Sequence, residues 1–241
     1  MNKQYKILII ACLVIIIAGA VYYFNKNTGG DNNQDKIAFI TGFTLLDDEK
    51  NLAWNEAVQL GDEARAQFES KIAEIKADLT TAADEDQRRA DYNNLAIYEK
   101  YLGNYREAYD AYLQSLNLES QARVTWQNFA DVLLKIKAYK SAEMAYKKAI
   151  ELNKYIPESY VKLADYYKVV GDSANIEATY KTAIETIKES MESDTLVLGA
   201  YAEWLGAQKR YGEAIKFYQE LVIKQPNNKA AIEKKIENLR K

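Results

Sequence analysis

Residues 123–156 read RVTWQNFADVLLKIKAYKSAEMAYKKAIELNKYI, and this stretch decides the fold because its pattern returns every 34 residues. Its large residues are Trp126, Phe129, Leu133 and Tyr146, and its small ones are Ala130, Ala142 and Ala149. Residues three and four positions apart share one face of a helix, so each half of the stretch predicts a helix. The small residues allow the two helices to approach closely. The stretch therefore predicts a pair of helices joined by a turn.

Three further copies of the pattern follow from the same spacing. Shifts of 34 residues reach Tyr160, Leu163, Ala164, Tyr167, Tyr180 and Ala183 on one side, and Tyr92, Leu95, Ala96, Ala108, Tyr112 and Ser115 on the other. After a four-residue insertion at 191–194, the last copy carries Leu198, Tyr201, Ala202, Leu205, Ala214, Tyr218 and Pro226. Each helix pair leaves one apolar face uncovered, so neighbouring pairs must stack. The sequence predicts repeats at 89–122, 123–156, 157–190 and 195–228.

The turns inside the predicted pairs have suitable residues. Gly103 and Gly171 each follow a large apolar residue, and Gly is the residue that most easily ends a helix in a left-handed conformation. Asn104 and Asp172 come next, and their side chains can cap the following helix.

At these positions the sequence resembles the tetratricopeptide-repeat family, whose motif places Trp, Leu-Gly, Tyr, Ala, Phe, Ala and Pro within 34 residues. The resemblance covers 89–228 and implies an all-α, right-handed superhelical solenoid of helix pairs. Glu99, Ile176 and Leu221 depart from the motif, because the first stands where an apolar residue is usual and the others where small residues are. Residues 229–241, apolar on one side and charged on the other, resemble the helix that caps such arrays.

The segment before the repeats, 37–88, is expected to be helical. Within 47–80, apolar residues recur at helical spacing around Leu60-Gly61-Asp62. This predicts a degenerate helix pair that packs on the N-terminal end of the array, with one long helix as the alternative. Residues 37–46 are apolar and would suit a short element packed on the first helices or a dimer contact.

The N-terminal 24 residues predict a membrane anchor. Residues 7–24 form an 18-residue stretch without a charge, which as a helix would span roughly 27 Å, close to the thickness of a bilayer core. Lys3 and Lys6 precede it, so the positive-inside rule keeps the N-terminus cytoplasmic. A polar linker at 25–36 then leads to an extracytoplasmic repeat domain, and we expect a bacterial cytoplasmic membrane.

Other fates of this segment remain open. Cleavage after Ala20 would make the segment a signal peptide. Lipidation of Cys12 is a further alternative, because Ile9-Ile10-Ala11-Cys12 resembles a bacterial lipobox. An anchor in a eukaryotic organelle with cytosolic repeats is also compatible with the sequence.

Composition narrows the classes of function. The chain contains 32 Lys and Arg against 35 Asp and Glu, with a net charge of -3, and a mildly acidic domain lacks the clustered cations that nucleic-acid binding needs. It contains no His, and its single Cys, Cys12, lies in the apolar N-terminal run, so the commonest general base and metal ligands are missing. We expect no enzyme, no cofactor, no metal site and no nucleic-acid partner. A hydrolase that uses paired carboxylates is the remaining catalytic alternative.

The resemblance implies a protein or peptide partner bound in a concave groove lined by the first helix of each repeat. In this chain those positions are Asn93, Ile97 and Lys100; Gln127, Asn128, Asp131 and Lys135; Val161, Lys162, Asp165 and Lys168; and Gly199, Glu203 and Gly206. One subclass of the family grips a terminal carboxylate, but Ile97 and Glu158 stand where that grip needs Asn and Lys. We therefore expect an adaptor without a carboxylate clamp, such as an accessory of a secretion, pilus or envelope-assembly complex. A self-associating scaffold is the alternative.

Overall fold

The computed structural model describes residue 45, residues 52–82 and residues 84–241. The predicted anchor at 1–24, the linker at 25–36 and, apart from Leu45, the apolar run at 37–46 lie outside the described residues. No helix in the described part of the chain is both long enough and apolar enough to cross a membrane.

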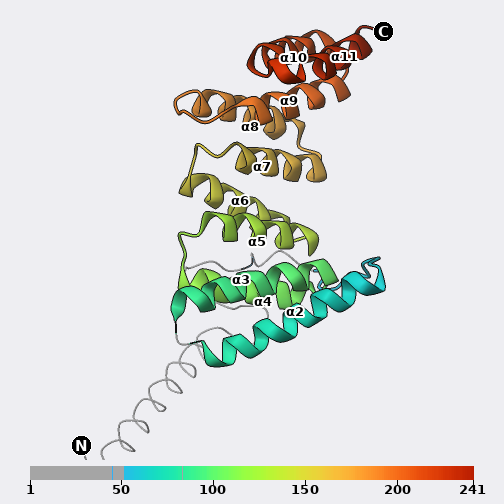
Figure 1. Ribbon diagram of the computed structural model, residues 1–241. Helices are drawn as coiled ribbons and strands as arrows, with labels where there is room; N and C mark the ends of the chain where they lie inside the picture. Colours follow the sequence, from blue (N-terminus) through green and yellow to red (C-terminus); the bar gives the residue numbers. More distant parts are fainter. Residues whose placement is uncertain (1–44, 46–51, 83) are drawn as a thin grey trace, which may run out of the picture. The chain divides into compact units, whose positions relative to one another are not determined.

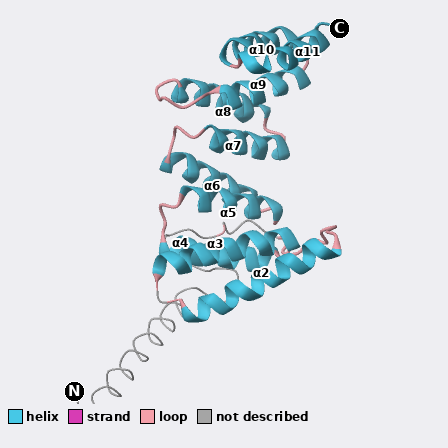
Figure 2. Ribbon diagram, in the orientation of Figure 1, coloured by secondary structure: helices cyan, strands magenta, loops and turns pink. Residues whose placement is uncertain are grey.

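The described residues form α-helices joined by short connections, and Figure 2 draws no strand among them. The helices are α2 (Asp62–Thr81), α3 (Glu85–Leu102), α4 (Tyr105–Leu118), α5 (Arg123–Lys135), α6 (Tyr139–Leu152), α7 (Pro157–Val170), α8 (Ser173–Ile187), α9 (Thr195–Ala207), α10 (Tyr211–Lys224) and α11 (Lys229–Arg240), with a 3-10 helix η1 (Pro226–Asn228) before the last. The predicted all-α fold is confirmed.

Consecutive helices pack as the pairs α3/α4, α5/α6, α7/α8 and α9/α10, and the pairs stack in chain order (Figure 1). In the pair α5/α6, Ala130, Ala142 and Ala149 are completely buried. A larger side chain at any of them would separate the helices, which explains why the pattern holds small residues there. Phe129 and Leu133 fill the space between the helices and are also completely buried. The predicted solenoid of helix pairs is confirmed.

The turn inside every pair contains one residue in the left-handed region. These residues are Gly103 (φ 81°), Lys137 (φ 68°), Gly171 (φ 78°) and Lys209 (φ 59°). The first three are 34 residues apart, and the insertion at 191–194 accounts for the longer step to the fourth. Two repeats thus use Gly, as predicted, and two accept the steric cost of Lys at the same place.

The departure at Leu221 has a matching change in the helix opposite. Leu221 is buried, and a Cβ atom built on Gly199 would lie 3.8 Å from its Cδ1 atom. The larger residue on α10 therefore faces a residue without a side chain on α9. Ile176, the other large residue at a small position, is also buried, on α8.

The helix pair predicted over 47–80 is wrong in its described first half. Residues 52–61, which we call the extended segment, form no helix and no regular structure apart from one isolated bridge between Asn55 and Asn104. Only α2 is helical. The Leu60-Gly61-Asp62 turn leads into α2 and does not join two helices.

Hydrogen bonds to the array explain the extended form. The Trp54 carbonyl accepts hydrogen bonds from the backbone N–H groups of Tyr105 (3.0 Å) and Arg106 (3.2 Å), the first two residues of α4. These N–H groups have no partner inside the helix. The Asn104 side chain, at the N-cap, donates to Glu99 Oε2 (2.8 Å) instead. The extended segment therefore caps α4.

Helices α2 and α11 cover the two ends of the stacked pairs. Helix α2 packs on α3, where Phe68 stacks on Tyr101 with ring centroids 5.5 Å apart. At the other end α11 packs on α10 and buries Ile232 and Ile236. The apolar faces of both terminal helices are thus used within the chain.

Candidate functional site

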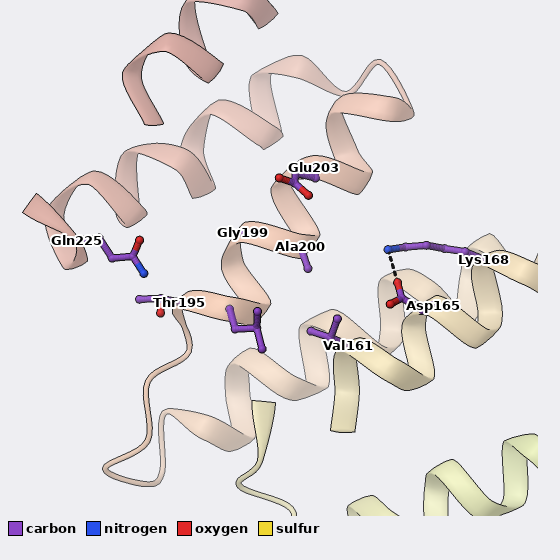
Figure 3. Close-up of a pocket in the computed structure, with 9 residues that line it drawn as sticks. Val161, Asp165, Lys168, Thr195, Gly199, Ala200, Glu203 and Gln225 are labelled. Atoms are coloured by element: carbon purple, nitrogen blue, oxygen red, sulfur yellow. Dashed lines mark hydrogen bonds and ion pairs between the residues drawn. The ribbon is translucent and has the colours of Figure 1, made fainter. Parts of the chain in front are cut away.

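First helices of consecutive repeats face one another along the groove, and two of the recesses between them bring together predicted groove residues of different repeats. The first, which we call the α7–α9 recess, has a volume of about 590 Å³. Its lining residues are Val161, Asp165 and Lys168 on α7, Thr195, Leu196, Gly199, Ala200 and Glu203 on α9, and Gln225 after α10 (Figure 3). The structure thus brings together predicted groove residues from the third and fourth repeats.

The α7–α9 recess is lined by charged side chains and by small residues of α9. Lys168 Nζ lies 2.8 Å from Asp165 Oδ1, as the dashed line in Figure 3 marks. Glu203 Oε1 lies 2.6 Å from Lys235 Nζ on α11. Gly199 and Ala200, which carry little or no side chain, also line the recess, so an extended segment of a partner could lie close to the backbone of α9.

The second recess, which we call the lysine recess, has a volume of about 960 Å³. The first-helix residues that line it are Lys100 and Tyr101 on α3, Asp131, Leu134 and Lys135 on α5, and Lys162 and Val169 on α7. The turn residue Lys137, Tyr105 and Tyr139 at the starts of second helices, and residues 53 and 55–59 of the extended segment complete the lining.

Both carboxylates of the lysine recess are already bonded. Asp131 accepts hydrogen bonds from the Tyr146 hydroxyl (2.6 Å) and from Lys162 Nζ (3.0 Å to Oδ2). Glu56 accepts a hydrogen bond from the Tyr105 hydroxyl and lies 3.6 Å from Lys135 Nζ. The hydrogen bond from Tyr105, together with Lys135, lowers the pKa of Glu56. Glu56 is therefore an anion over the whole neutral range.

Lys100 is in a different position. Burial lowers the pKa of Lys100; Asp131 acts in the opposite direction, and the neighbouring charges of Lys162 and Lys135 lower it further. In the described part of the chain, Lys100 has no carboxylate within ion-pair distance. Its ammonium group is thus partly desolvated without direct neutralisation.

The remaining predicted groove residues serve packing and internal bonds. Asn93 accepts a hydrogen bond from Thr125 Oγ1 (3.4 Å) and lines a separate recess at the start of α3 and α5. Gln127 Oε1 accepts from Arg123 Nη1 (3.2 Å) and Ser159 Oγ (3.1 Å) and so joins α5 to α7. Ile97 packs against the core, and Asn128 is half-buried on α5.

Buried carboxylates do not form a reactive pair here. Among the described residues, Asp91, Glu99 and Asp194 are the buried carboxylates. They accept hydrogen bonds from Gln87, from Lys76 and Asn104, and from Lys224, respectively. The described part of the chain also contains no cluster of acidic residues suited to a metal ion. The arrangement of the described residues is suited to binding.

Sequence reasoning missed the apolar part of the lysine recess. Tyr139 and Val169 line it with 39% and 62% of their surfaces exposed. Tyr139 begins a second helix and Val169 lies one residue before the end of a first helix, so neither belongs to the groove positions that the resemblance implies. Both residues lie within two positions of an inter-helix turn residue, Lys137 or Gly171, and this position in the sequence could have indicated that they line the recess.

Comparison with known families agrees with the helix pairs. The sequence model described as tetratricopeptide repeat matches residues 125–155, within α5 and α6. This segment has the tetratricopeptide-repeat pattern. Such repeats generally mediate protein–protein interactions, and proteins built from them are typically non-catalytic interaction modules. No curated protein sequence matches the chain.

Solved structures with tetratricopeptide-like solenoids share the fold. The structure of MamA matches 71% of this chain and 97% of its own, with 18% sequence identity and a TM-score of 0.53. The structure of BtubC (BKLC) from P. vanneervenii matches 74% of this chain and 82% of its own, with 12% identity and a TM-score of 0.55. At this level of identity the likeness concerns the fold alone.

Proposed function

We propose that this chain is a non-catalytic adaptor that binds a segment of a protein partner in the groove formed by its first helices. The observation that carries the proposal is the pair of recesses lined by first-helix residues of successive repeats. Stacked repeats create long concave surfaces of this kind, and such surfaces bind extended segments. The exposed charged groups at the rim, such as Asp165 and Lys168, would fix the position of the bound segment.

The proposal includes attachment to a membrane through residues 7–24, with the repeats on the extracytoplasmic side. The uncharged stretch and the preceding Lys3 and Lys6 support it. Carbonate extraction of cells that express the full chain tests it, because an integral anchor stays with the membrane pellet. Release into the supernatant, or a mature N-terminus after Ala20, would contradict a retained anchor.

Self-association through the terminal helices receives less support. Ile72 and Ile75 of α2 are buried against the rest of the chain, and so are Ile232 and Ile236 of α11. A dimer that used these apolar faces would first have to expose them, at a cost of about 25 cal/mol for each Å² uncovered.

Photo-crosslinking in cells tests the groove. A crosslinking amino acid is placed at Val169 in the lysine recess or at Leu196 in the α7–α9 recess, both exposed. Met144 is a matched control, because it is apolar and 48% exposed on the second helix α6. We expect the same crosslinked partner from the groove positions and none from Met144. Equal crosslinking from Met144 would rule out the groove as the binding surface.

A further inference from the structure

We propose that the lysine recess recognises an acidic segment of the partner, in which Asp or Glu side chains flank an aliphatic or aromatic residue. This inference rests on the proposed function and specifies what one part of the groove binds. It concerns carboxylates of side chains and not the chain terminus of the partner.

Positive charges outnumber negative charges in the lysine recess. Within the described residues that line it, Lys100, Lys135, Lys137 and Lys162 face two carboxylates, those of Glu56 and Asp131. Asp131 is paired with Lys162 and Glu56 with Lys135, so within the described residues Lys100 and Lys137 are left without a carboxylate partner. The recess keeps an excess of positive charge although the whole chain is acidic.

The Lys100 ammonium group is partly buried beside Lys162 and Lys135 and forms no ion pair within the described residues. Within the described residues this partly desolvated cation lies over the Tyr101 ring, with Nζ 5.3 Å from the ring centroid, but has no carboxylate partner. An incoming carboxylate therefore gains more here than at an exposed lysine. The low pKa that burial gives Lys100 agrees with this environment.

The lysine recess also has an apolar wall. Tyr101, Tyr139 and Val169 line the same recess, and 48%, 39% and 62% of their surfaces are exposed. They lie on α3, at the start of α6 and near the end of α7, so one side chain inserted between the lysines would contact residues of three helices. An aliphatic or aromatic residue of the ligand is suited to this wall.

The placement of the lysines favours several carboxylates over one. The four lysines come from α3, α5, the turn after α5 and α7, so three successive repeats contribute positive charge to the recess. The α7–α9 recess differs, because two carboxylates and one lysine line it. The acidic part of the bound segment is therefore placed over the first three repeats.

Selection from a random peptide library displayed on phage tests the inference. Peptides fused through their C-termini to the coat protein offer only side-chain carboxylates, and the target is the purified full chain. We expect enrichment of Asp and Glu beside Leu, Phe or Tyr. Library selection that enriches peptides without acidic residues, or none at all, would overturn the inference.

Variants then locate the site with the best selected peptide, labelled with fluorescein and measured by fluorescence anisotropy. Because Lys100 forms no ion pair within the described residues, Lys100→Gln is expected to fold normally and to bind about five- to tenfold more weakly. Lys216→Gln, at an exposed position on α10, is the matched control and should bind as the unchanged chain does. Affinity should also fall as salt is raised.

Two further results would be decisive. Equal binding by Lys100→Gln would overturn the inference, and loss of binding when the free peptide is amidated at its C-terminus would contradict recognition of side-chain carboxylates. Crosslinking of the natural partner at Leu196 or Val169 would still stand in both cases. Failure of the inference is thus distinguishable from failure of the proposed function.

Discussion

The Nζ atom of Lys76 on α2 lies 2.9 Å from Oε1 of Glu99 on α3. The Glu99 side chain is only 4% exposed, whereas that of Lys76 is 55% exposed. Removal of the lysine would leave a buried carboxylate without its cation, so Lys76→Met should lower the free energy of unfolding by about 1–3 kcal/mol. Glu99→Leu should cost less, because the freed Lys76 can turn into water. Urea unfolding of the full chain followed by circular dichroism measures both.

The double variant provides the control for this asymmetry. Glu99→Leu restores the apolar residue that is usual in the repeat pattern, so Lys76→Met added to it should cost little more. If Lys76→Met is as harmful in the presence of Leu as in the presence of Glu99, packing of the lysine stem and not its charge explains the loss.

Gly103 and Gly171 offer a matched pair of substitutions. Both have left-handed φ angles, 81° and 78°, so alanine should strain each turn by about 1 kcal/mol. At Gly103 the new Cβ atom would lie 2.1 Å from the Glu56 carbonyl oxygen, whereas at Gly171 no other atom lies within 4 Å. We expect Gly103→Ala to displace the extended segment as well.

Hydrogen exchange separates these two effects. The backbone N–H of Glu56 donates to the Gly103 carbonyl (3.1 Å), and that of Ala53 donates to the Ile136 carbonyl (3.1 Å). Exchange at residues 53–58 should become faster in Gly103→Ala and stay unchanged in Gly171→Ala. Equal protection in the two variants would show that the extended segment is not held by this turn.

The repeat period predicted most of the solenoid but not the side-chain bonds between successive repeats. The Tyr167 hydroxyl donates to Glu143 (2.6 Å), and 34 residues later the Tyr201 hydroxyl donates to Glu177 (3.3 Å). Both bonds join a second helix to the first helix of the next repeat. Glu143 and Glu177 share one position in the unit, but Tyr201 stands four positions earlier in its unit than Tyr167 does because of the insertion at 191–194. The period therefore predicts the two carboxylates but not their tyrosine partners.

Contacts that occur once in the chain could not be predicted in this way. Trp54 stands at helical spacing from its neighbours, yet the segment is extended because its carbonyl bonds to the start of α4. Glu99 stands where the repeat pattern usually has an apolar residue, and only the fold shows that Lys76 of α2 pairs with it. The lysine recess likewise depends on how α3, α5 and α7 align, and alignment between helices is decided by packing rather than by local sequence.

Glu177 should contribute a share of stability that depends on pH. The hydrogen bonds from Arg210, with Nη1 at 2.5 Å, and from Lys181 lower the pKa of Glu177 to about 2 from its ordinary value of 4.5. A lowered pKa means that the stabilisation is complete above pH 4.5 and is lost as the pH falls toward 2. Because solvent reaches the pair, we expect Glu177→Gln to cost only about 1 kcal/mol at pH 7.

Between pH 4.5 and 2, the stability of Glu177→Gln should therefore fall less steeply than the stability of the unchanged chain. Thermal unfolding at a series of pH values measures it. Glu213→Gln removes a second carboxylate from the same arginine but within α10, so it should flatten the curve less. A larger effect at Glu213 would mean that the ion pair between Glu177 on α8 and Arg210 is not the main source of the pH-dependent stability.

Lys209 tests whether the turn residue of each repeat is under the same constraint. Its φ of 59° places a side chain where glycine is preferred. Lys209→Gly removes the steric cost of about 1–2 kcal/mol but adds about 0.4–1 kcal/mol of unfolded-state entropy. The net effect should range from neutral to a gain of about 1 kcal/mol. Lys216→Gly, inside α10, should instead cost about 1 kcal/mol. Chemical unfolding of both variants compares the signs, and a loss at Lys209 equal to that at Lys216 would show that the left-handed turn is not strained.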